Sequence, residues 1–401
     1  MKKTLDFEKI PARSLIIFYI NVIESLFILI GTIILFYVVA RPILFYATPY
    51  LNDINLKEKS GNELTDILVE SNLAEYDKKT NVLSTVDSLY SSFVYKNIKY
   101  CYESYKDIYK ENLDEYGYET KLDFFNSVEE INYQNDNLGY FYTEYIIGKL
   151  DVNGDLIINI DDSNKYNYFI YEVLDIDEEG NKFFEYDKND LSIYPHLKLD
   201  VCRYLFQYHL MDVRYSTLRD TDNEFYNYFK DRYKEAGNYL LMYSDYEENL
   251  SLYNNLYDKT ELNLLSTSIL SYIGSLFIFS FIIPLCFKDK ETLSLKLFKC
   301  KKLNKKDKAT YLNYFLDGLK SFLYNFYTLL FSLFIFGGTN LLNIHFLEIG
   351  VFTFNSLHII LLSLIVNMIS LLILLIKKNS QGLFSLITKT KYFENILIKK
   401  I

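Results

Sequence analysis

The sequence predicts an α-helical membrane protein with four transmembrane helices and an extracytoplasmic α+β domain inserted between the first two. Residues 1–50 and 261–401 contain four long apolar runs, whereas residues 51–260 are polar and acidic. This middle segment has 21 Lys and Arg against 42 Asp and Glu, a net charge of −21, and the rest of the chain has 21 against 10, a net charge of +11. The contrast in apolar content and in charge predicts one large domain outside the bilayer.

Each apolar run is long enough to cross a bilayer, which takes about 20 largely apolar residues in a helix. The runs are 15–40, 262–287, 321–344 and 352–376. The first contains one charged residue, Glu24, and the other three contain none. Because the first run is longer than the apolar core of a secretory signal peptide, about 7–15 residues, we expect an uncleaved anchor.

The positions of Lys and Arg predict the orientation, because basic residues beside a span are retained on the cytoplasmic side. They precede the first run, crowd the link 288–320 and recur in the tail 377–401. With four spans, both termini and the link are expected in the cytoplasm and residues 51–260 outside. Residues 1–50 then hold the first transmembrane helix and 261–401 the other three. Arg41 disagrees with this pattern.

The middle segment is predicted to combine helices with a small antiparallel meander. Apolar residues recur at three- and four-residue intervals in 82–109, 197–210 and 224–257, which indicates helices. Segments 140–152 and 155–160 flank Asn153 and Gly154, residues typical of a tight hairpin turn. A second pair of strands, 166–176 and 182–186, is expected around Gly180. Most tyrosines of the chain, 29 of 39, lie in this domain.

Oxygen-bearing side chains in residues 151–162 have roughly the spacing of a calcium loop. They are Asp151, Asn153, Asp155, Asn159, Asp161 and Asp162. Leu156 stands where such a loop keeps a glycine, and Asp162 where a bidentate Glu is expected. A turn with solvated acidic residues explains the same pattern, and we favour it, with no metal or other cofactor.

The cysteines and histidines of this domain indicate no catalytic site. Cys101 and Cys202 are the pair that topology leaves together, and they form a disulfide if the outer face is oxidising. We favour two buried free thiols. Neither His196 nor His209 belongs to a nucleophile or metal pattern. No enzymatic activity is predicted, and the net charge of −21 disfavours nucleic acid as a partner.

Polar residues in the first and fourth runs form the second candidate site. An ionisable residue inside a membrane span costs free energy, so it is a candidate functional residue. Glu24 lies near Asn21 on one helical face, and Ser363, Asn367 and Ser370 recur on one face of the fourth run. They line a path for an ion, or they join helices through hydrogen bonds. We favour the second alternative and single out Glu24 for testing.

The basic link is expected to contact lipid head groups. Lys299, Lys301 and Lys302 lie directly beneath the predicted inner leaflet, where each Lys gains about 1 kcal/mol from anionic lipids. The same residues also set the topology, and both roles are compatible.

Three segments resemble the RDD family of bacterial membrane proteins. Residues 290–301, KETLSLKLFKCK, are similar to that family's TLGKKLFGLK segment through Thr292 and Lys296. Residues 381–390, QGLFSLITKT, are similar to its QGLHDLIAGT signature through Gln381, Gly382 and Thr390. Arg13 stands where the family keeps its first arginine. The resemblance covers about 11–46 and 262–392 and leaves residues 51–260 as a large insertion.

The chain departs from the family at both aspartates that give the family its name. Ile20 and Ser385 stand at those positions, and Ser294 and Lys299 stand at the two glycines of the central segment. The resemblance implies a multi-pass protein of the bacterial cell membrane. Some members are linked to cation/proton antiport or small-solute transport, and the missing acids argue against that chemistry unless Glu24 replaces them.

Together these observations predict a non-enzymatic membrane protein of RDD-like type. Its acidic, Tyr-rich outer domain is expected to bind a protein partner at the cell surface. The alternative is a small-solute or cation/proton transporter that uses the polar residues of its membrane helices. A third class, an envelope hydrolase, has no nucleophile or metal motif behind it.

Overall fold

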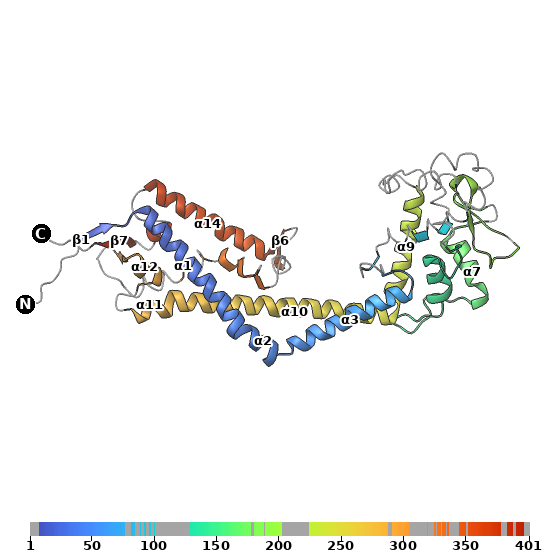
Figure 1. Cartoon of the computed structure of the whole chain (residues 1–401), viewed down its shortest axis with the longest axis horizontal. Coiled ribbons are helices and arrows are strands. Elements are labelled where there is room, and N and C mark those ends of the chain that lie inside the picture. The colour runs from blue at the N-terminus through green and yellow to red at the C-terminus, as the bar shows by residue number, and fades with distance from the viewer. Residues whose placement is uncertain are drawn as a thin grey trace, which may run out of the picture. The chain divides into compact units, whose positions relative to one another are not determined.

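The structure is a computed structural model in which two compact units can be described separately (Figure 1). We call Met1–Asn55 with Leu256–Ile401 the apolar unit and Leu56–Asn255 the acidic unit. The described residues are 8–76, 82–84, 129–177, 180–187, 189–202, 224–287, 291–304, 345–349, 352–377, 383–387 and 390–396, with a few between 89 and 100 and between 319 and 336. The division falls within two helices, near the boundaries 51 and 260 expected from the sequence.

Two helical stretches of the apolar unit are long and apolar enough to cross a membrane, among the residues that can be described. Ser14–Ala47 consists of α1 (Ser14–Leu35), the π-helix η1 (Phe36–Ala40) and α2 (Arg41–Ala47). Ser244–Cys286 consists of α10 (Ser244–Phe277), η6 (Ile278–Ile282) and α11 (Ile283–Cys286). These stretches contain the first two predicted runs, and α10 starts well before the predicted residue 262.

The remaining helices of the apolar unit are α12 (Leu293–Leu297), α14 (Ser356–Lys377) and α15 (Leu383–Ile387). The fourth run begins later than predicted, because residues 352–355 form strand β6 (Phe352–Asn355), which pairs with β5 (His345–Ile349). Much of the third run lies outside the described residues. Its described part from Asn325 to Phe336 is helical, and Leu329 and Leu333 pack with Ile28 of α1.

A three-stranded antiparallel sheet, which the sequence did not predict, joins segments that flank the membrane-type helices. Its order is β1 (Glu8–Pro11), β7 (Thr390–Ile396) and β4 (Cys300–Asn304). Alternate residues of the two longer strands face the unit, so Cys300, Thr390 and Tyr392 are buried. A small core packs against this face and contains Ile17, Ile20, Leu295 and Leu374.

The acidic unit has an aromatic core covered by short helices. Its elements are α6 (Asn137–Tyr140), η3 (Phe141–Tyr145), η4 (Asp162–Asn164), α7 (Lys165–Tyr168), η5 (Phe169–Val173), β2 (Phe184–Glu185), β3 (His196–Leu197) and α9 (Glu224–Met242). Helix α3 (Tyr50–Glu70) and α10 each contribute to both units. The core contains Tyr142, Phe169, Phe184 and Phe229, all fully buried.

The predicted strands 140–152 and 166–176 are wrong, because both segments begin as helices. Asp136 caps the first through a hydrogen bond from the Gly139 amide to its carboxylate, 2.9 Å long. The residues that this helix buries, Leu138, Phe141, Tyr142 and Tyr145, have helical spacing. Burial against a shared core therefore overrode the strand preference of Tyr, Phe and Ile.

The turns and the other helices agree better with the sequence. Gly154 has a φ of +86°, a conformation that glycine adopts without strain, and Leu150 bridges to Leu156 across the predicted turn.

Strand β2 falls within 182–186, yet its partner is β3 and not the predicted segment 166–176. The predicted helix 224–257 is present as α9 and α10 with a break at Tyr243. In 82–109, residues 82–84 are not helical, whereas Leu89 and Phe93 are.

Candidate functional site

The polar residues predicted in the membrane lie on α1 and α14 and take part mostly in helix contacts. Asn367 donates a hydrogen bond to the Ser363 carbonyl in its own helix, 3.0 Å. The buried Ser370 hydroxyl accepts one from the Leu383 amide at the start of α15, 3.1 Å. The Asn21 carbonyl accepts one from the Ser25 hydroxyl, 2.9 Å. Glu24 is half-buried and makes contacts of its own.

Small residues bring α1 and α10 into close contact. The Ser275 hydroxyl donates a hydrogen bond to the Ile28 carbonyl, 2.7 Å. A Cβ added at Gly31 would collide with the Phe279 ring and the Ser275 hydroxyl. A close helix pair of this kind, joined through a hydroxyl, is typical of membrane helices. The Ser25 hydroxyl also lies within hydrogen-bond distance of the Asn325 side chain, which joins α1 to the third apolar segment.

Arg13, the arginine of the RDD resemblance, pairs with a residue that the sequence did not single out. The Arg13 amide and Nε lie 3.0 and 3.4 Å from Glu394 Oε1, in the middle strand of the three-stranded sheet. Arg13 is mostly exposed, so this ion pair contributes little free energy. The hydrogen bond from the Arg13 amide joins the start of α1 to β7.

The other described residues of the resemblance lie in or next to α12, α15 and β7. Thr292 caps α12, since its hydroxyl accepts a hydrogen bond from the Leu295 amide, 3.4 Å. Thr390 and Ser385 are buried. Gln381 and Gly382 lie outside the described residues.

Lys299 adopts a left-handed backbone conformation, with a φ of +53°, just after α12 ends. Glycine is favoured at this position after a helix, because a Cβ makes the conformation unfavourable. We therefore expect Lys299→Gly to raise the stability of the apolar unit by up to about 1 kcal/mol. Thermal unfolding of the full chain in detergent measures this.

Two matched variants separate backbone strain from charge. Lys299→Ala removes the same charge without relieving the backbone, so we expect no gain. Lys296→Gly places a glycine inside α12 and should cost about 1 kcal/mol. Equal melting of Lys299→Gly and Lys299→Ala would contradict the assignment of strain to residue 299.

The basic residues beside this turn divide into two groups. Lys296 and Lys299 are exposed, and the Lys296 ammonium lies 3.8 Å from the centre of the Phe287 ring. Lys301 lies 3.9 Å from the Glu291 carboxylate, and Lys302 lies over the Tyr392 ring at 5.4 Å. The exposed pair is therefore better placed for lipid head groups than Lys301 and Lys302.

The thiol of Cys300 is an inert part of the small core. Burial, with the Glu394 and Glu291 carboxylates, raises the pKa of Cys300 to about 11. The thiol therefore stays protonated near neutral pH and is a poor nucleophile. Cys300 and Cys286 are free cysteines.

The expectation of a free thiol at Cys202 is wrong, because Cys202 is disulfide-bonded. Cys101 lies outside the described residues. Disulfides persist mainly in oxidising compartments. The disulfide at Cys202 is therefore evidence about the compartment that contains the acidic unit.

Asp136 has a fully buried carboxylate in the acidic unit. Its Oδ2 accepts hydrogen bonds from the Tyr194 hydroxyl, 2.8 Å, and from the Gly139 amide. Burial raises the pKa of Asp136, and the two hydrogen bonds oppose that change. The sequence signal for this residue is an Asp directly before a helix, with Gly139 as its third helical residue.

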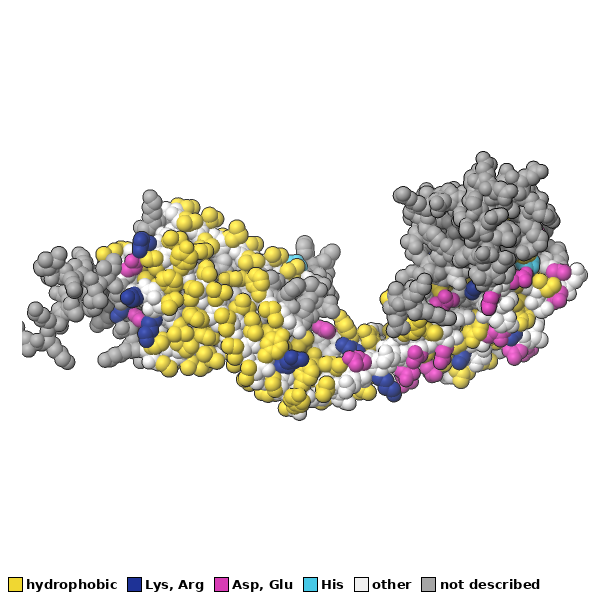
Figure 2. All heavy atoms as spheres, in the orientation of Figure 1, with side chains coloured by type: hydrophobic (Ala, Val, Ile, Leu, Met, Phe, Trp, Pro, Cys, Tyr) yellow, Lys and Arg dark blue, Asp and Glu magenta, His cyan; other side chains and the backbone are white. Residues whose placement is uncertain are grey.

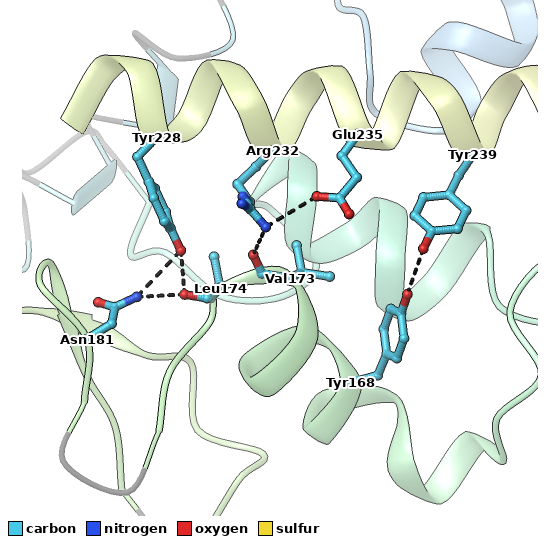
Figure 3. A network of polar contacts seen from close by, with 8 residues as sticks. All are labelled: Tyr168, Val173, Leu174, Asn181, Tyr228, Arg232, Glu235 and Tyr239. Carbon is cyan, nitrogen blue, oxygen red and sulfur yellow. Dashed lines mark hydrogen bonds and ion pairs between the residues drawn. The ribbon is translucent and has the colours of Figure 1, made fainter. Parts of the chain in front are cut away.

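One face of α9 is fixed to the core by a network of polar contacts (Figure 3). The Tyr228 hydroxyl and the Asn181 amide both donate to the Leu174 carbonyl. Arg232 donates to the Val173 carbonyl and pairs with Glu235, each at 3.2 Å. The hydroxyls of Tyr168 and Tyr239 lie 3.2 Å apart. Most described tyrosines thus serve the core and its edge rather than an open surface.

Asp151, Asn153 and Asp155, three of the residues considered as calcium ligands, form a turn, whereas Asp161 and Asp162 lie at the start of η4. The Asp151 carboxylate accepts hydrogen bonds from the amides of Asn153, 2.8 Å, and Asp155, 2.9 Å. The Asp155 amide is the largest cause of a lowered pKa at Asp151. Within the parts of the chain that can be described, no group of three or more His, Cys, Asp or Glu residues is placed to hold a metal ion.

His196 lies in a stacked aromatic contact. Its ring centre is 3.9 Å from that of Tyr100, and burial lowers its pKa. His209 lies outside the described residues.

No family model, no curated protein and no solved structure matches this chain. The resemblance to the RDD family therefore stays a prediction that depends on its motif residues.

Proposed function

We propose that this chain is an integral membrane protein of RDD-like type that holds an acidic binding domain on the outer face of a bacterial cell membrane. The observation that carries the proposal is the apolar surface of α1, α10 and α14. Large hydrophobic side chains on these helices are exposed at helical intervals, including Leu15, Ile30, Leu270, Phe277, Leu362 and Met368. Figure 2 shows hydrophobic side chains spread over the visible face of α1 and α14. An apolar surface of this extent is unfavourable in water and favourable in lipid.

The three-stranded sheet supports a topology in which three segments of the chain lie on the same side of the membrane. Strand β1 precedes α1, β4 follows α11, and β7 follows α14. Hydrogen-bonded strands of one small sheet lie on one side of a bilayer, so an even number of crossings separates each pair. This supports four spans, with the Lys-rich side in the cytoplasm.

The location of the acidic unit outside the cytoplasm has support from its covalent chemistry and charge. A disulfide at Cys202 fits an oxidising compartment. Exposed acidic residues, among them Glu58, Glu63, Glu247 and Glu248, lie on α3 and α10. Because opposite charge speeds and selects association, the partner that fits best is a protein with a cationic surface.

The left-handed Lys299 supports the resemblance, because a family glycine at this position would adopt the same conformation freely. The transporter alternative gains less support, since Ser363, Asn367 and Ser370 lie in ordinary helix contacts.

Labelling of single cysteines in intact cells tests the proposal. In a chain whose native cysteines other than Cys101 and Cys202 are replaced, Glu63→Cys should react with a membrane-impermeant maleimide. Lys391→Cys, at a residue that is also exposed and lies on β7, should react only after the cells are opened. The reverse pattern would contradict the sidedness.

A photo-crosslinking amino acid at position 63 tests the binding role. A salt-sensitive adduct is expected there and not at position 391. Loss of the chain from membranes washed with alkaline carbonate would contradict membrane insertion itself.

A further inference from the structure

Arg41 is a cation at the predicted outer end of the first span. The rule that basic residues are retained on the cytoplasmic side does not account for a cation at this position. Arg41 begins α2, its side chain is exposed, and its guanidinium lies over the rings of Tyr37 and Phe45 at 5.6 and 5.1 Å. No carboxylate of the described residues forms an ion pair with it. Its N–H donors therefore lack a protein acceptor in the part of the chain that can be described.

The other described cation near this end of the helix pair is neutralised. The Lys259 ammonium of α10 lies 2.8 Å from the carboxylate of Asp53, which is itself buried. These two cations at the same end of the apolar unit thus differ in the partners that they contact. Among the described residues, Lys259 has an acidic partner, whereas the partners of Arg41 are aromatic rings.

The depth of Arg41 matches a head-group layer. At about 1.5 Å per residue, the 28 positions from Arg13 to Arg41 span about 42 Å, and a bilayer with its head groups is about 40–45 Å thick. With Arg13 at the inner layer, Arg41 reaches the outer one. Tyr37 lies about one turn before Arg41 and Tyr46 between one and two turns after it, and Tyr46 is 86% exposed. Tyrosines are enriched at this level of a membrane.

We propose that Arg41 binds the phosphate group of a phospholipid in the outer leaflet, with Tyr37, Phe45 and Tyr46 around the head group. The planar guanidinium matches a phosphate with two parallel hydrogen bonds. The rings keep the side chain at the interface and contribute cation–π attraction. This inference rests on the proposed membrane insertion, because it requires the outer leaflet.

Native mass spectrometry of the full chain, released into detergent from phosphatidylglycerol nanodiscs, counts the phospholipids that stay bound. We expect Arg41→Gln to lower retention of one phospholipid about fivefold, the ratio that corresponds to about 1 kcal/mol. Arg41→Lys should fall between the two, because an ammonium lacks the fork of donors. Lys59→Gln, which removes an exposed cation of α3, should match the unchanged chain.

Two further arms identify the ligand. A glycosyl diacylglycerol without phosphate should be retained less than phosphatidylglycerol, and millimolar inorganic phosphate should not displace the bound lipid. Equal retention by Arg41→Gln, equal retention of the glycolipid, or displacement by phosphate would each overturn the lipid site. If the chain washes out of membranes in carbonate, the proposed function fails instead.

Discussion

Tyr392→Ala is expected to disrupt the three-stranded sheet and to lower the stability of the apolar unit by about 3 kcal/mol. The ring is 3% exposed in the central strand β7, and it packs in the small core with Ile17, Leu295 and Leu374. Truncation of a large buried aromatic residue typically costs about 3–5 kcal/mol. We place the effect at the lower end because this core is small.

Hydrogen exchange of the full chain in detergent measures the effect locally. The amides of β1, β4 and β7 should exchange faster, and those of α9 in the acidic unit should not change. Lys391→Ala is the matched control, because its side chain is exposed in the same strand. Unchanged exchange in β4 would show that the core does not depend on the Tyr392 ring.

Asp136→Ala is expected to destabilise the acidic unit by about 2–5 kcal/mol. The substitution removes a helix cap, which costs about 1–2 kcal/mol. It also leaves the buried Tyr194 hydroxyl without its acceptor, which costs about 1–3 kcal/mol. Asp136→Asn keeps an oxygen in the same place and should retain most of the stability. Asp155→Ala, at an exposed turn, is the control.

The pH dependence has a definite sign. Because burial raises the pKa of Asp136 in the folded state, folding favours the protonated acid. That stabilisation is lost as the pH rises from the ordinary Asp pKa, near 4, through the raised value. Asp136→Asn should therefore gain stability relative to the unchanged chain as the pH rises above about 4, by about 1.4 kcal/mol per unit of pKa shift. Chemical denaturation of both chains at several pH values tests this, and a constant difference would contradict it.

The sequence predicts the first apolar helix well because that helix carries its own signal, whereas the long helix α3 was not predicted. The run 15–40 is apolar throughout except for Glu24, and α1 with η1 covers it. The three-stranded sheet carries no such signal, since its strands are short and contain charged residues. The sheet joins segments that lie far apart in the sequence, as does the contact of Arg13 with Glu394, 381 residues apart. Local periodicity cannot reveal a partner at that distance.

The candidate sites show the same limit. Arg13 and Thr292 can be singled out from the sequence because they match motif residues. The partner Glu394 and the aromatic core around Tyr142 can be identified only in the folded chain. The helix from Asn137 was missed because its aromatic residues favour strands in isolation, although Asp136 before it is a helix-start signal. Cys202 was assigned the wrong redox state because its bonding depends on compartment and geometry rather than on spacing.

The order β1-β7-β4 has a consequence for biosynthesis. The central strand lies after every predicted membrane crossing, so the first strand leaves the ribosome hundreds of residues before its neighbour exists. Until β7 emerges, the edges of β1 and β4 are unpaired and open to wrong association. Because closing so long a loop is slow, assembly of the three-stranded sheet should be a late step, and a holding chaperone would be most useful in that interval.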